Sequence, residues 1–300
     1  MKALVFGSLN IDYVYQVPHF VERGETLAST SFQRFCGGKG LNQAIALSRA
    51  GLETCMAGAI GEEGEFLLRE LTKAGVDTGF VERCSVPTGH AVIQNSPDGD
   101  NCILLYGGAN RSICLDQIRK ALDPFGPGDL LLVQNEINRL EEIVRAAKER
   151  GMRIALNPSP MEKETILPVL PLADIVILNR VEAGQLLESS AAEPERLLEG
   201  LAALSPGSMI VLTLGTKGAM LFSDGRVIHQ KAFAVRAVDT TGAGDSFTGY
   251  FLAGMSLEQD LAFALRYAAA AAAIAVTRAG AAPSIPHREE TLRFLKDTAE

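Results

Sequence analysis

The stretch Val238-Asp239-Thr240-Thr241-Gly242-Ala243-Gly244-Asp245-Ser246-Phe247 joins a glycine-rich turn to a carboxylate at the start of a helix. Apolar residues spaced by three and four positions predict that this helix spans residues 246–255. The glycines lie at its N-terminus, where the backbone can turn sharply and aim several N–H groups at one point. The positive end of the helix dipole lies behind them. A negatively charged phosphoryl group fits such a cradle.

Asp245 needs a reason to lie beside a phosphate, because two negative charges repel each other. A role as the acceptor of the proton from an attacking hydroxyl supplies such a reason. The alternative is that Asp245 only caps the helix and that Gly242 and Gly244 only form a turn. The stretch therefore indicates phosphoryl transfer, and other motifs have to decide between the two interpretations.

The composition is that of an ordinary globular protein. The chain has 300 residues, of which 47% are hydrophobic and 21% are charged, so that it can form a sizeable core. The net charge is -8 and the isoelectric point is about 5.2. These values argue against binding to nucleic acid or to an anionic membrane surface.

Three features favour a cytoplasmic protein. Residues 1–7 have the pattern of a short buried strand rather than of a signal peptide. The longest apolar run, residues 267–276, is too short to span a bilayer. The five cysteines are scattered and show no Cys-X-X-Cys spacing, which argues against a disulfide framework or a zinc site.

Apolar strand patterns alternate with helical patterns along most of the chain, which predicts an α/β fold with a mostly parallel sheet covered by helices on both faces. The strands are expected at residues 129–133, 153–157, 174–178 and 209–214, and the helices at 140–150, 181–188 and 195–204. We find no linker that would divide the chain, and we expect a single domain over residues 1–300.

A second pattern interrupts this alternation. Residues 11–17, 26–35, 88–95 and 101–106 resemble exposed antiparallel strands. The sequence Pro97-Asp98-Gly99-Asp100 between the last two is a strong hairpin turn. These segments predict a small β-sheet that projects from the main domain as a lid.

Two motifs in the N-terminal part have the residues of a ligand site. Gly7-Ser8-Leu9-Asn10-Ile11-Asp12 follows the first strand and places Asn10 and Asp12 on one side of an extended segment, at the strand end where open α/β sheets bind ligands. An amide and a carboxylate can together bond vicinal hydroxyls, although a polar turn would look the same. Gly37-Gly38-Lys39-Gly40-Leu41-Asn42 opens a helix and offers Lys39 and Asn42 to a small ligand. Its spacing is not that of a P-loop.

Two motifs in the C-terminal half are more ambiguous. In Asn179-Arg180-Val181-Glu182, the glutamate could hold Mg²⁺ through water, and it could equally belong to a helix cap. Thr213-Leu214-Gly215-Thr216-Lys217-Gly218 joins two strands through a glycine-rich turn. A nucleotide could pass over this backbone, but an ordinary hairpin has the same pattern.

Taken in this order, the motifs resemble the PfkB (ribokinase) family of sugar and nucleoside kinases along nearly the whole chain. The blocks Gly37-Gly38-Lys39-Gly40 and Asp239-Thr240-Thr241-Gly242-Ala243-Gly244-Asp245 look like the two signatures of that family. Four further stretches look most like its ribose-phosphorylating members. They are residues 7–12, Gly107-Gly108-Ala109-Asn110, Asn157-Pro158-Ser159-Pro160 and residues 275–284.

The resemblance implies a ribokinase-like fold and the ATP-dependent phosphorylation of D-ribose at its 5-hydroxyl. Asp245 would take the proton, and the amides of Gly242, Ala243 and Gly244 would form the anion hole. The implied sugar site consists of Asn10, Asp12, Gly38, Lys39, Gly40, Asn42 and Glu136. The implied nucleotide side consists of Asn179, Thr213, Gly215, Thr216, Lys217, Gly218 and Gly244.

The resemblance also implies two ions and a partner. Glu182 would serve Mg²⁺ through water. A potassium-like ion would lie beside the anion hole at the positions of Asp239, Thr241, Ala275, Arg278, Gly280 and Ser284, mostly through backbone carbonyls. The chain departs from many relatives at Ala269, where they have a polar residue near the adenine, which leaves base selectivity open. The edges of exposed lid strands present unpaired backbone N–H and C=O groups that favour association. A homodimer through the lid would cover these edges.

Two alternatives remain open. The chain could act on a ketohexose, a deoxyribose or a nucleoside, although it shows no aromatic pair that would stack a base. It could also be a sugar sensor that kept the fold and lost catalysis. The presence of Asp245 and of the full glycine cradle argues against a sensor.

Overall fold

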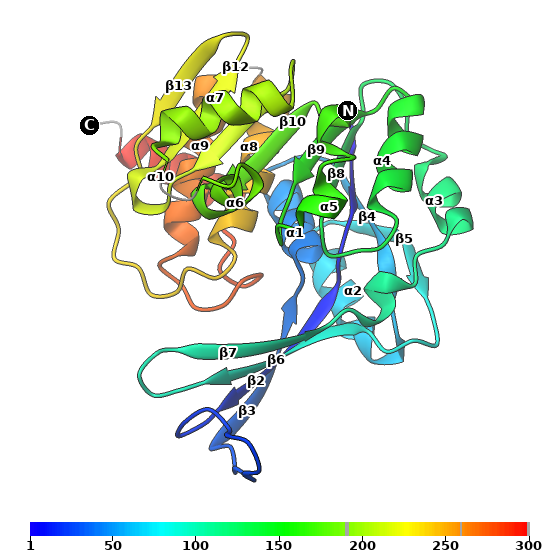
Figure 1. The fold of residues 1–300 in the computed structure, drawn as a ribbon, viewed down its shortest axis with the longest axis vertical. Helices are drawn as coiled ribbons and strands as arrows, with labels where there is room; N and C mark the ends of the chain where they lie inside the picture. Colours follow the sequence, from blue (N-terminus) through cyan, green and yellow to red (C-terminus); the bar gives the residue numbers. More distant parts are fainter. Residues whose placement is uncertain (190–191, 259, 299–300) are drawn as a thin grey trace.

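The computed structural model describes residues 1–189, 192–258 and 260–298. It consists of a large α/β body and a small sheet that projects from it (Figure 1). Within these residues, the body contains a sheet of nine strands in the order β13-β12-β11-β10-β9-β8-β1-β4-β5. The strands are β1 (Ala3–Phe6), β4 (Thr54–Ile60), β5 (Asp77–Arg83), β8 (Leu130–Gln134), β9 (Arg153–Asn157), β10 (Ile175–Asn179), β11 (Met209–Thr213), β12 (Ala219–Ser223) and β13 (Arg226–Gln230).

Seven neighbouring strands, from β5 to β11 in this order, run parallel, and β12 and β13 continue the sheet antiparallel. Successive side chains of a strand point to opposite faces, and both faces of this sheet are buried. In β1, Val5 packs in one core cluster while Leu4 and Phe6 pack in the other. This arrangement confirms the predicted, mostly parallel sheet with a core on each face.

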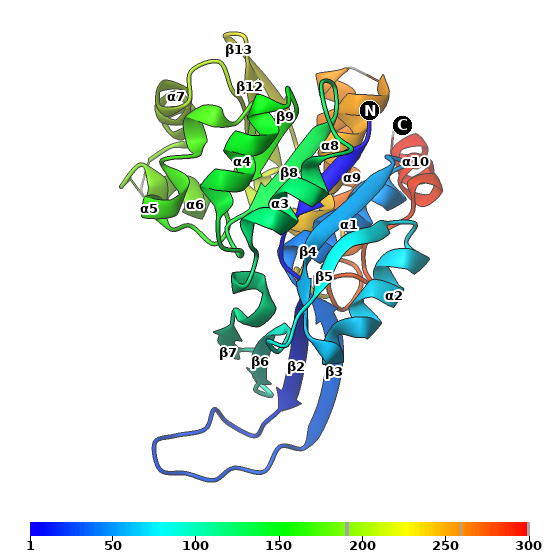
Figure 2. The same cartoon turned by 90° about the vertical axis from the view of Figure 1, so that its right-hand side faces the viewer.

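Five helices cover each face of the sheet in the described part of the chain (Figure 2). One face packs against α1 (Lys39–Arg49), α2 (Glu65–Lys73), α8 (Ala243–Glu258), α9 (Leu261–Ala275) and α10 (Arg288–Asp297). The other packs against α3 (Leu115–Leu122), α4 (Leu140–Glu149), α5 (Lys163–Ile166), α6 (Arg180–Leu186) and α7 (Pro194–Leu204).

The projecting sheet has the strand order β3-β2-β6-β7 and extends away from the body (Figure 1). Its strands are β2 (Asn10–Gln16), β3 (Ser31–Gly37), β6 (Gly89–Asn95) and β7 (Asn101–Tyr106). The turn at residues 96–100 forms the predicted hairpin, with Gly99 at a φ of 90°. We refer to these four strands as the lid.

Two expectations for the lid were wrong. The strand expected at residues 26–35 begins only at Ser31, because the preceding residues form no ladder. The central pair, β2 and β6, runs parallel rather than antiparallel. The chain leaves the lid after β3, builds α1, β4, α2 and β5 in the body, and re-enters the lid in the direction of β2. Such a crossover, unlike a tight hairpin, can join parallel strands.

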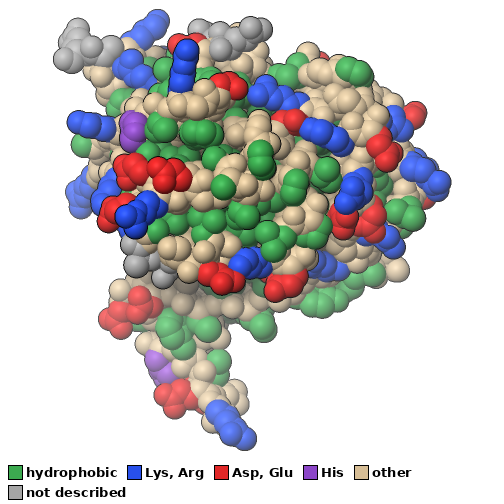
Figure 3. Space-filling view, turned by 45° about the horizontal axis from the view of Figure 1, so that its top comes forward, with side chains coloured by type: hydrophobic (Ala, Val, Ile, Leu, Met, Phe, Trp, Pro, Cys, Tyr) green, Lys and Arg blue, Asp and Glu red, His purple; other side chains and the backbone are tan. Residues whose placement is uncertain are grey.

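The helix that follows the glycine-rich turn also differs from the expectation. It spans Ala243–Glu258 rather than residues 246–255, so that Asp245 lies inside its first turn. The other predicted elements of the body agree with the observed bounds to within about two residues. No helix in the described ranges combines the length and the apolar character that crossing a bilayer requires. Acidic and basic side chains are interspersed on the face of the body shown in Figure 3.

Candidate active site

The polar residues singled out from the sequence gather at the carboxyl edge of the parallel sheet, where open α/β sheets bind ligands. Ser8 follows β1, and Glu136 follows β8. Asn157, Asn179 and Thr213 are the last residues of β9, β10 and β11. The N-termini of α1 and α8 meet at this edge, because a side chain of each helix hydrogen-bonds to the other.

Asp245 is the centre of this cluster. Its side chain is 8% exposed, and both of its carboxylate oxygens accept hydrogen bonds from amides of α1. Asn42 Nδ2 donates to Oδ2 at 3.0 Å, and Gln43 Nε2 donates to Oδ1 at 2.8 Å. Because the carboxylate faces these side chains rather than the backbone N–H groups of its own helix, the capping interpretation of Asp245 is wrong.

The start of α1 is packed closely against the loop after β1. Gly38 has a φ of 93°, and a Cβ there would lie 2.8 Å from the carbonyl oxygen of Ser8. A Cβ on Gly40 would lie 2.5 Å from the nitrogen of Ser8. The glycines therefore allow the approach that puts Lys39 and Asn42 into the site. Burial lowers the pKa of the Lys39 ammonium, but nearby carboxylates outweigh this effect and raise the pKa above its ordinary value.

Asn10 and Asp12 lie on the same side of β2, at the base of the lid. Asn110 Nδ2 donates to Asn10 Oδ1 at 2.7 Å and thereby fixes the Asn10 amide. Burial and the nearby charge of Glu136 raise the pKa of Asp12 to about 6. Asp12 lies over Gly37, where a Cβ would be 2.3 Å from Asp12 Oδ2.

Glu136, which was expected in the sugar site, lies beside Ser8 and Lys39. Its Oε2 accepts a hydrogen bond from the Ser8 hydroxyl and another, at 3.1 Å, from the Lys39 backbone N–H. Ser8 was not among the residues predicted for the site. The Ser8 hydroxyl contacts Glu136. The position of Ser8 directly after the first strand, beside Gly7, could have pointed to a place in the site.

A chain of buried amides behind Asp245 was also not predicted. Gln43 bonds to Asn157 Oδ1 at 2.9 Å, and Gln134 Nε2 donates to Gln43 Oε1 at 2.7 Å. Gln43 and Gln134 are completely buried. The signal that could have revealed the chain is that β8 and β9 both end on an amide residue although their preceding residues are aliphatic.

The glycine-rich turn that was expected to form the anion cradle lies in front of α8. Gly242 has a φ of 73°, and a Cβ there would lie 2.9 Å from Ala281 Cα. A Cβ on Gly244 would meet no heavy atom within 4 Å, so this side of the turn is open. Gly242 therefore presses on the loop that follows α9, while Gly244 faces the space in which a ligand can lie.

Asp239 connects the glycine-rich turn to the loop that follows α9. Its Oδ1 accepts from the backbone N–H and the hydroxyl of Thr241, and its Oδ2 accepts from the N–H of Gly280 at 2.8 Å. Partial burial acts to raise the pKa of Asp239, but these hydrogen bonds outweigh it and hold the pKa below its usual value. The structure thus brings together the two loops expected to flank a potassium-like ion.

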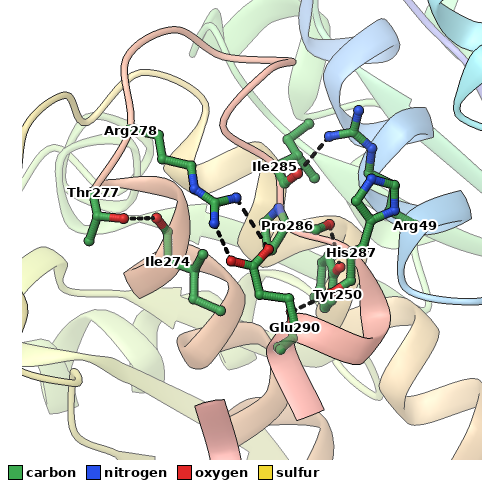
Figure 4. Close-up of polar contacts among 10 residues, drawn as sticks. Arg49, Tyr250, Ile274, Thr277, Arg278, Ile285, Pro286, His287 and Glu290 are labelled. Atoms are coloured by element: carbon green, nitrogen blue, oxygen red, sulfur yellow. Dashed lines mark hydrogen bonds and ion pairs between the residues drawn. The ribbon is translucent and has the colours of Figure 1, made fainter. Parts of the chain in front are cut away.

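The loop after α9, residues 276–287, is tied down from three helices (Figure 4). Arg49 Nη1 of α1 donates to the carbonyl oxygens of Ala282 at 3.1 Å and of Ile285 at 2.6 Å. Tyr250 of α8 donates its hydroxyl to the Pro286 carbonyl at 2.7 Å. Arg278 forms an ion pair with Glu290 of α10, which holds its guanidinium beside that helix. Ser284 is buried and donates to the Ala281 carbonyl.

A mainly apolar pocket of about 550 Å³ lies beside the cradle. Five of the residues expected on the nucleotide side line it: Thr213, Gly215, Thr216, Gly218 and Gly244. Asn179 and Lys217 are not among its lining residues. The remaining lining consists of Ala232, Phe233, Ala234, Val235, Ala237, Thr240, Ala243, Phe247, Ala269, Ala272, Ala273 and Val276. Ala243 and Ala269 were singled out from the sequence, whereas most of the other residues are small or apolar ones without a distinctive pattern.

The cap interpretation of Glu182 is correct. Asn179 Oδ1 accepts from the Glu182 N–H, and Glu182 Oε2 accepts from the Asn179 N–H, both at 2.9 Å. This reciprocal pair is a capping box at the start of α6. It does not exclude a second role, because the contact uses one of the two carboxylate oxygens.

The family model of pfkB family carbohydrate kinases matches residues 1–288. This chain belongs to that family of carbohydrate kinases. The family assignment agrees with the resemblance of the two glycine-rich signatures, of which the first opens α1 and the second ends with Asp245 in the first turn of α8.

Three relatives illustrate the similarity. A ribokinase from Haemophilus influenzae is 36% identical over 301 residues, which cover 97% of each chain. A deoxyribokinase from Salmonella typhi is 29% identical over 98% of this chain and 99% of its own. The structure of Arabidopsis thaliana ribokinase complexed with ribose and ATP is 31% identical over 98% of both chains, with a TM-score of 0.88. The chain therefore has the ribokinase-like α/β fold.

Proposed function

We propose that this carbohydrate kinase transfers the terminal phosphoryl group of ATP to the 5-hydroxyl of D-ribose. The observation that carries the proposal is the position of Asp245. Its carboxylate accepts a hydrogen bond from Asn42 of α1, and the residue lies in the first turn of α8, next to Gly244 of the glycine-rich turn. The Arabidopsis relative, whose structure holds ribose and ATP, has the same fold over nearly the whole chain.

In the proposed sugar site, Asn10, Asp12 and Asn42 bond the ring hydroxyls. Asn42 Oδ1 is buried and has no partner within the described residues, so that it is ready to accept from a hydroxyl. Asp12 is an acceptor without a donor in the described part of the chain, and Asn10 is held in place by Asn110. A sugar with vicinal hydroxyls satisfies these groups, and leaving them unpaired in a dry pocket is costly.

In the proposed reaction, the 5-hydroxyl gives its proton to Asp245 while its oxygen attacks the terminal phosphorus of ATP, and the bond to the leaving ADP oxygen breaks. Negative charge spreads over the phosphoryl oxygens as this happens. The amides of Gly242, Ala243 and Gly244, backed by the dipole of α8, stabilise that charge where it develops. Asp245 then carries the proton, and ribose 5-phosphate and ADP leave.

The nucleotide would lie in the apolar pocket beside the cradle. Its phosphates would extend from the hairpin residues Thr213 and Gly215 toward Gly244, all of which line that pocket. Ala269 supplies no polar side chain to this lining, so base selectivity would depend on shape and backbone groups.

The residues present fit the two implied ions. No three His, Cys, Asp or Glu side chains of the described chain are grouped to hold a metal by themselves. That arrangement suits Mg²⁺, which keeps several waters and is held largely by substrate phosphates, with Glu182 acting through water. Bound Mg²⁺ neutralises phosphate charge. The Asp239 and Gly280 loops would hold a potassium-like ion that orders the cradle amides, with Thr241, Ala275, Arg278 and Ser284 as the other flanking positions.

The lid would exclude water, the competing nucleophile, from the sugar side. It also exposes large apolar side chains on β3 and β7, among them Phe32, Ile103 and Leu104. Every residue of β7 is exposed, and β7 is an edge strand of the lid. Packing of two lids about a two-fold axis would cover this surface, so we propose a homodimer.

The test is ATP consumption with D-ribose, 2-deoxy-D-ribose, D-fructose and a nucleoside in parallel. We expect D-ribose to have the highest kcat/KM, at least about tenfold above 2-deoxy-D-ribose, because loss of one hydroxyl leaves a site group unpaired. A preference for 2-deoxy-D-ribose would support the alternative suggested by the Salmonella relative. Binding of a sugar without ATP consumption would support a sensor.

A further inference from the structure

Gln43 occupies the centre of the buried amide chain behind Asp245. Its side chain is completely buried and makes three hydrogen bonds. Nε2 donates to Asp245 Oδ1 at 2.8 Å and to Asn157 Oδ1 at 2.9 Å, while Oε1 accepts from Gln134 Nε2 at 2.7 Å. All the hydrogen-bonding atoms of this amide are therefore used in the absence of any ligand.

The Asp245 carboxylate fixes the donor-to-acceptor direction of the hydrogen bonds among these buried amides. An ionised Asp245 can only accept, so the nitrogen of Gln43 must face it. The oxygen of Gln43 then faces Gln134, which must present its own nitrogen. A reversed Gln43 amide would set oxygen against oxygen at both Asp245 and Asn157. The Gln43 side chain thus has one orientation that satisfies its neighbours.

The far end of the chain is anchored on the sheet. Gln134 ends β8 and Asn157 ends β9, and Asn157 Nδ2 donates to the Ile177 carbonyl of β10 at 2.8 Å. Gln134 Oε1 lies where Gly7, after β1, has no side chain, since a Cβ there would be 2.2 Å away. Gln43 therefore links one oxygen of Asp245, through hydrogen bonds, to residues that are fixed in parallel strands.

The other donor to Asp245 has a different environment. Asn42 Nδ2 bonds to Oδ2, but its buried Oδ1 is unpaired in the described chain, and Asn42 belongs to the proposed sugar site. Asp245, Glu136 after β8 and Glu182 of α6 all act to raise the pKa of Lys39 of α1, so these four charged groups share this region. Of the two amides on Asp245, Gln43 is the one whose two N–H groups are both donated to the protein and whose oxygen already accepts from Gln134.

We propose that Gln43 is a positioning residue that fixes the direction of the Asp245 carboxylate and keeps one of its oxygens aimed at the acceptor hydroxyl. The proposal rests on the proposed function, in which Asp245 accepts the proton. Gln43 contacts neither sugar nor nucleotide in this account, so its effect belongs to kcat rather than to the affinity for substrates.

The first test is Gln43→Met, alone and combined with Asp245→Asn. The single variant should lose about 10²-fold in kcat with both KM values within about threefold, because the base is misplaced while the binding residues are kept. In the Asp245→Asn background the same substitution should change the residual turnover by less than about threefold. An equal loss in both backgrounds would overturn the proposal. Near-normal turnover of Asp245→Asn alone would instead overturn the proposed function.

The second test is Gln43→Glu, which does not depend on how Gln43→Met folds. A neutral carboxylic acid can donate to Asp245 as the amide does, whereas a carboxylate repels it. The ratio of variant to wild-type kcat should therefore fall at least about tenfold between about pH 6 and about pH 8.5. A ratio that does not change with pH would overturn the proposal.

Gln117→Glu is the matched control. Gln117 of α3 is also buried and donates its amide, to the Gly58 carbonyl at 2.6 Å, but it lies outside the proposed site. This variant should lower thermal stability and leave the pH dependence of kcat like that of the wild type. A pH-dependent ratio in the control as well would assign the effect to burial of a carboxylate in general and would also overturn the proposal.

Discussion

Asp245 and Asp12 are two carboxylates of the same site in very different settings. Asp245 belongs to the body, is 8% exposed and accepts hydrogen bonds on both oxygens. Asp12 belongs to the lid and accepts no hydrogen bond from the described residues, while burial and Glu136 raise its pKa to about 6. In the proposed function, the body thus fixes the group that accepts the proton, and the lid carries a group whose donors would come from the ligand.

The contrast extends to the surrounding structure. The proposed base, Asp245, is held by amides anchored on buried parallel strands, and such fixed groups need no reorganisation during the reaction. The lid is a four-stranded sheet with an exposed edge strand and exposed apolar side chains. Changes in the body should therefore act on turnover, and changes in the lid should act on sugar affinity.

The largest expected effect is that of Asp245→Asn. Turnover should fall by about 10²–10⁴-fold, the usual contribution of a general base, since the substitution removes only the proton acceptor. Ribose and ATP binding, measured by calorimetry, should stay within roughly tenfold. Near-normal turnover would show that the body does not supply the base.

Gly242→Ala should have the next largest effect. The positive φ of 73° disfavours a side chain, and the added Cβ would lie 2.9 Å from Ala281 Cα, so the cradle amides must move. We expect kcat to fall about 10²-fold, as when one donor to the developing charge is lost. The control is Gly207→Ala, at a φ of 85° with open space around it, which should lose stability and keep normal kinetics. A normal kcat for Gly242→Ala would contradict the cradle.

Asp12→Ala tests the lid. The ribose KM should rise about 10- to 100-fold, because hydroxyl donors lose their acceptor in a dry pocket, while kcat changes little. Steady-state kinetics with varied ribose at saturating ATP would measure the change. An unchanged KM would mean that Asp12 is only a structural residue of strand β2.

The smallest effect is the pH dependence of ribose affinity. The pKa of Asp12 is raised to about 6, so the carboxylate becomes protonated and loses acceptor capacity as the pH falls through that value. The ribose KM should therefore rise below about pH 6 in the wild type and stay flat in Asp12→Asn. An identical rise in both proteins would assign the titration to another group.

The raised pKa of Asp12 also affects the stability of the fold. Low pH should weaken ribose affinity, but it favours folding. Because the pKa is higher in the folded than in the unfolded chain, the contribution of Asp12 to stability is greatest at acidic pH and is lost as the pH rises through about 6. Asp12→Asn should thus raise the free energy of unfolding near pH 8 by about 1 kcal/mol. The ionised carboxylate of Asp12 therefore lowers the stability of the folded protein near pH 8.

The sequence was sufficient for those features that depend on local patterns. Aliphatic runs such as Leu130–Val133 can only be buried strands, and the hairpin at Gly99 follows from its turn residues. Lys39, Asn42 and Asp245 were assigned to one site by the family resemblance, which rests on two glycine-rich helix starts. Whether Glu182 caps a helix could not be decided, since a metal-serving glutamate and a capping box have the same spacing.

The remaining features depend on contacts between distant segments. Gln43 and Gln134 are 91 positions apart, and an isolated glutamine on a helix gives no sign that it bonds to a catalytic carboxylate. The parallel pairing of β2 with β6 arises because an inserted body unit separates them. The apolar lining of the pocket consists of common residues such as Ala269 and Val276, which only the fold brings together.

The most direct test of the central claim compares D-ribose with 5-deoxy-D-ribose, which keeps the ring hydroxyls and lacks the acceptor. The account predicts that D-ribose is converted to ribose 5-phosphate with consumption of ATP, and that 5-deoxy-D-ribose inhibits competitively without being phosphorylated. Phosphorylation of 5-deoxy-D-ribose at a rate comparable to that of D-ribose would contradict the account, since Asp245 would then act on a different hydroxyl.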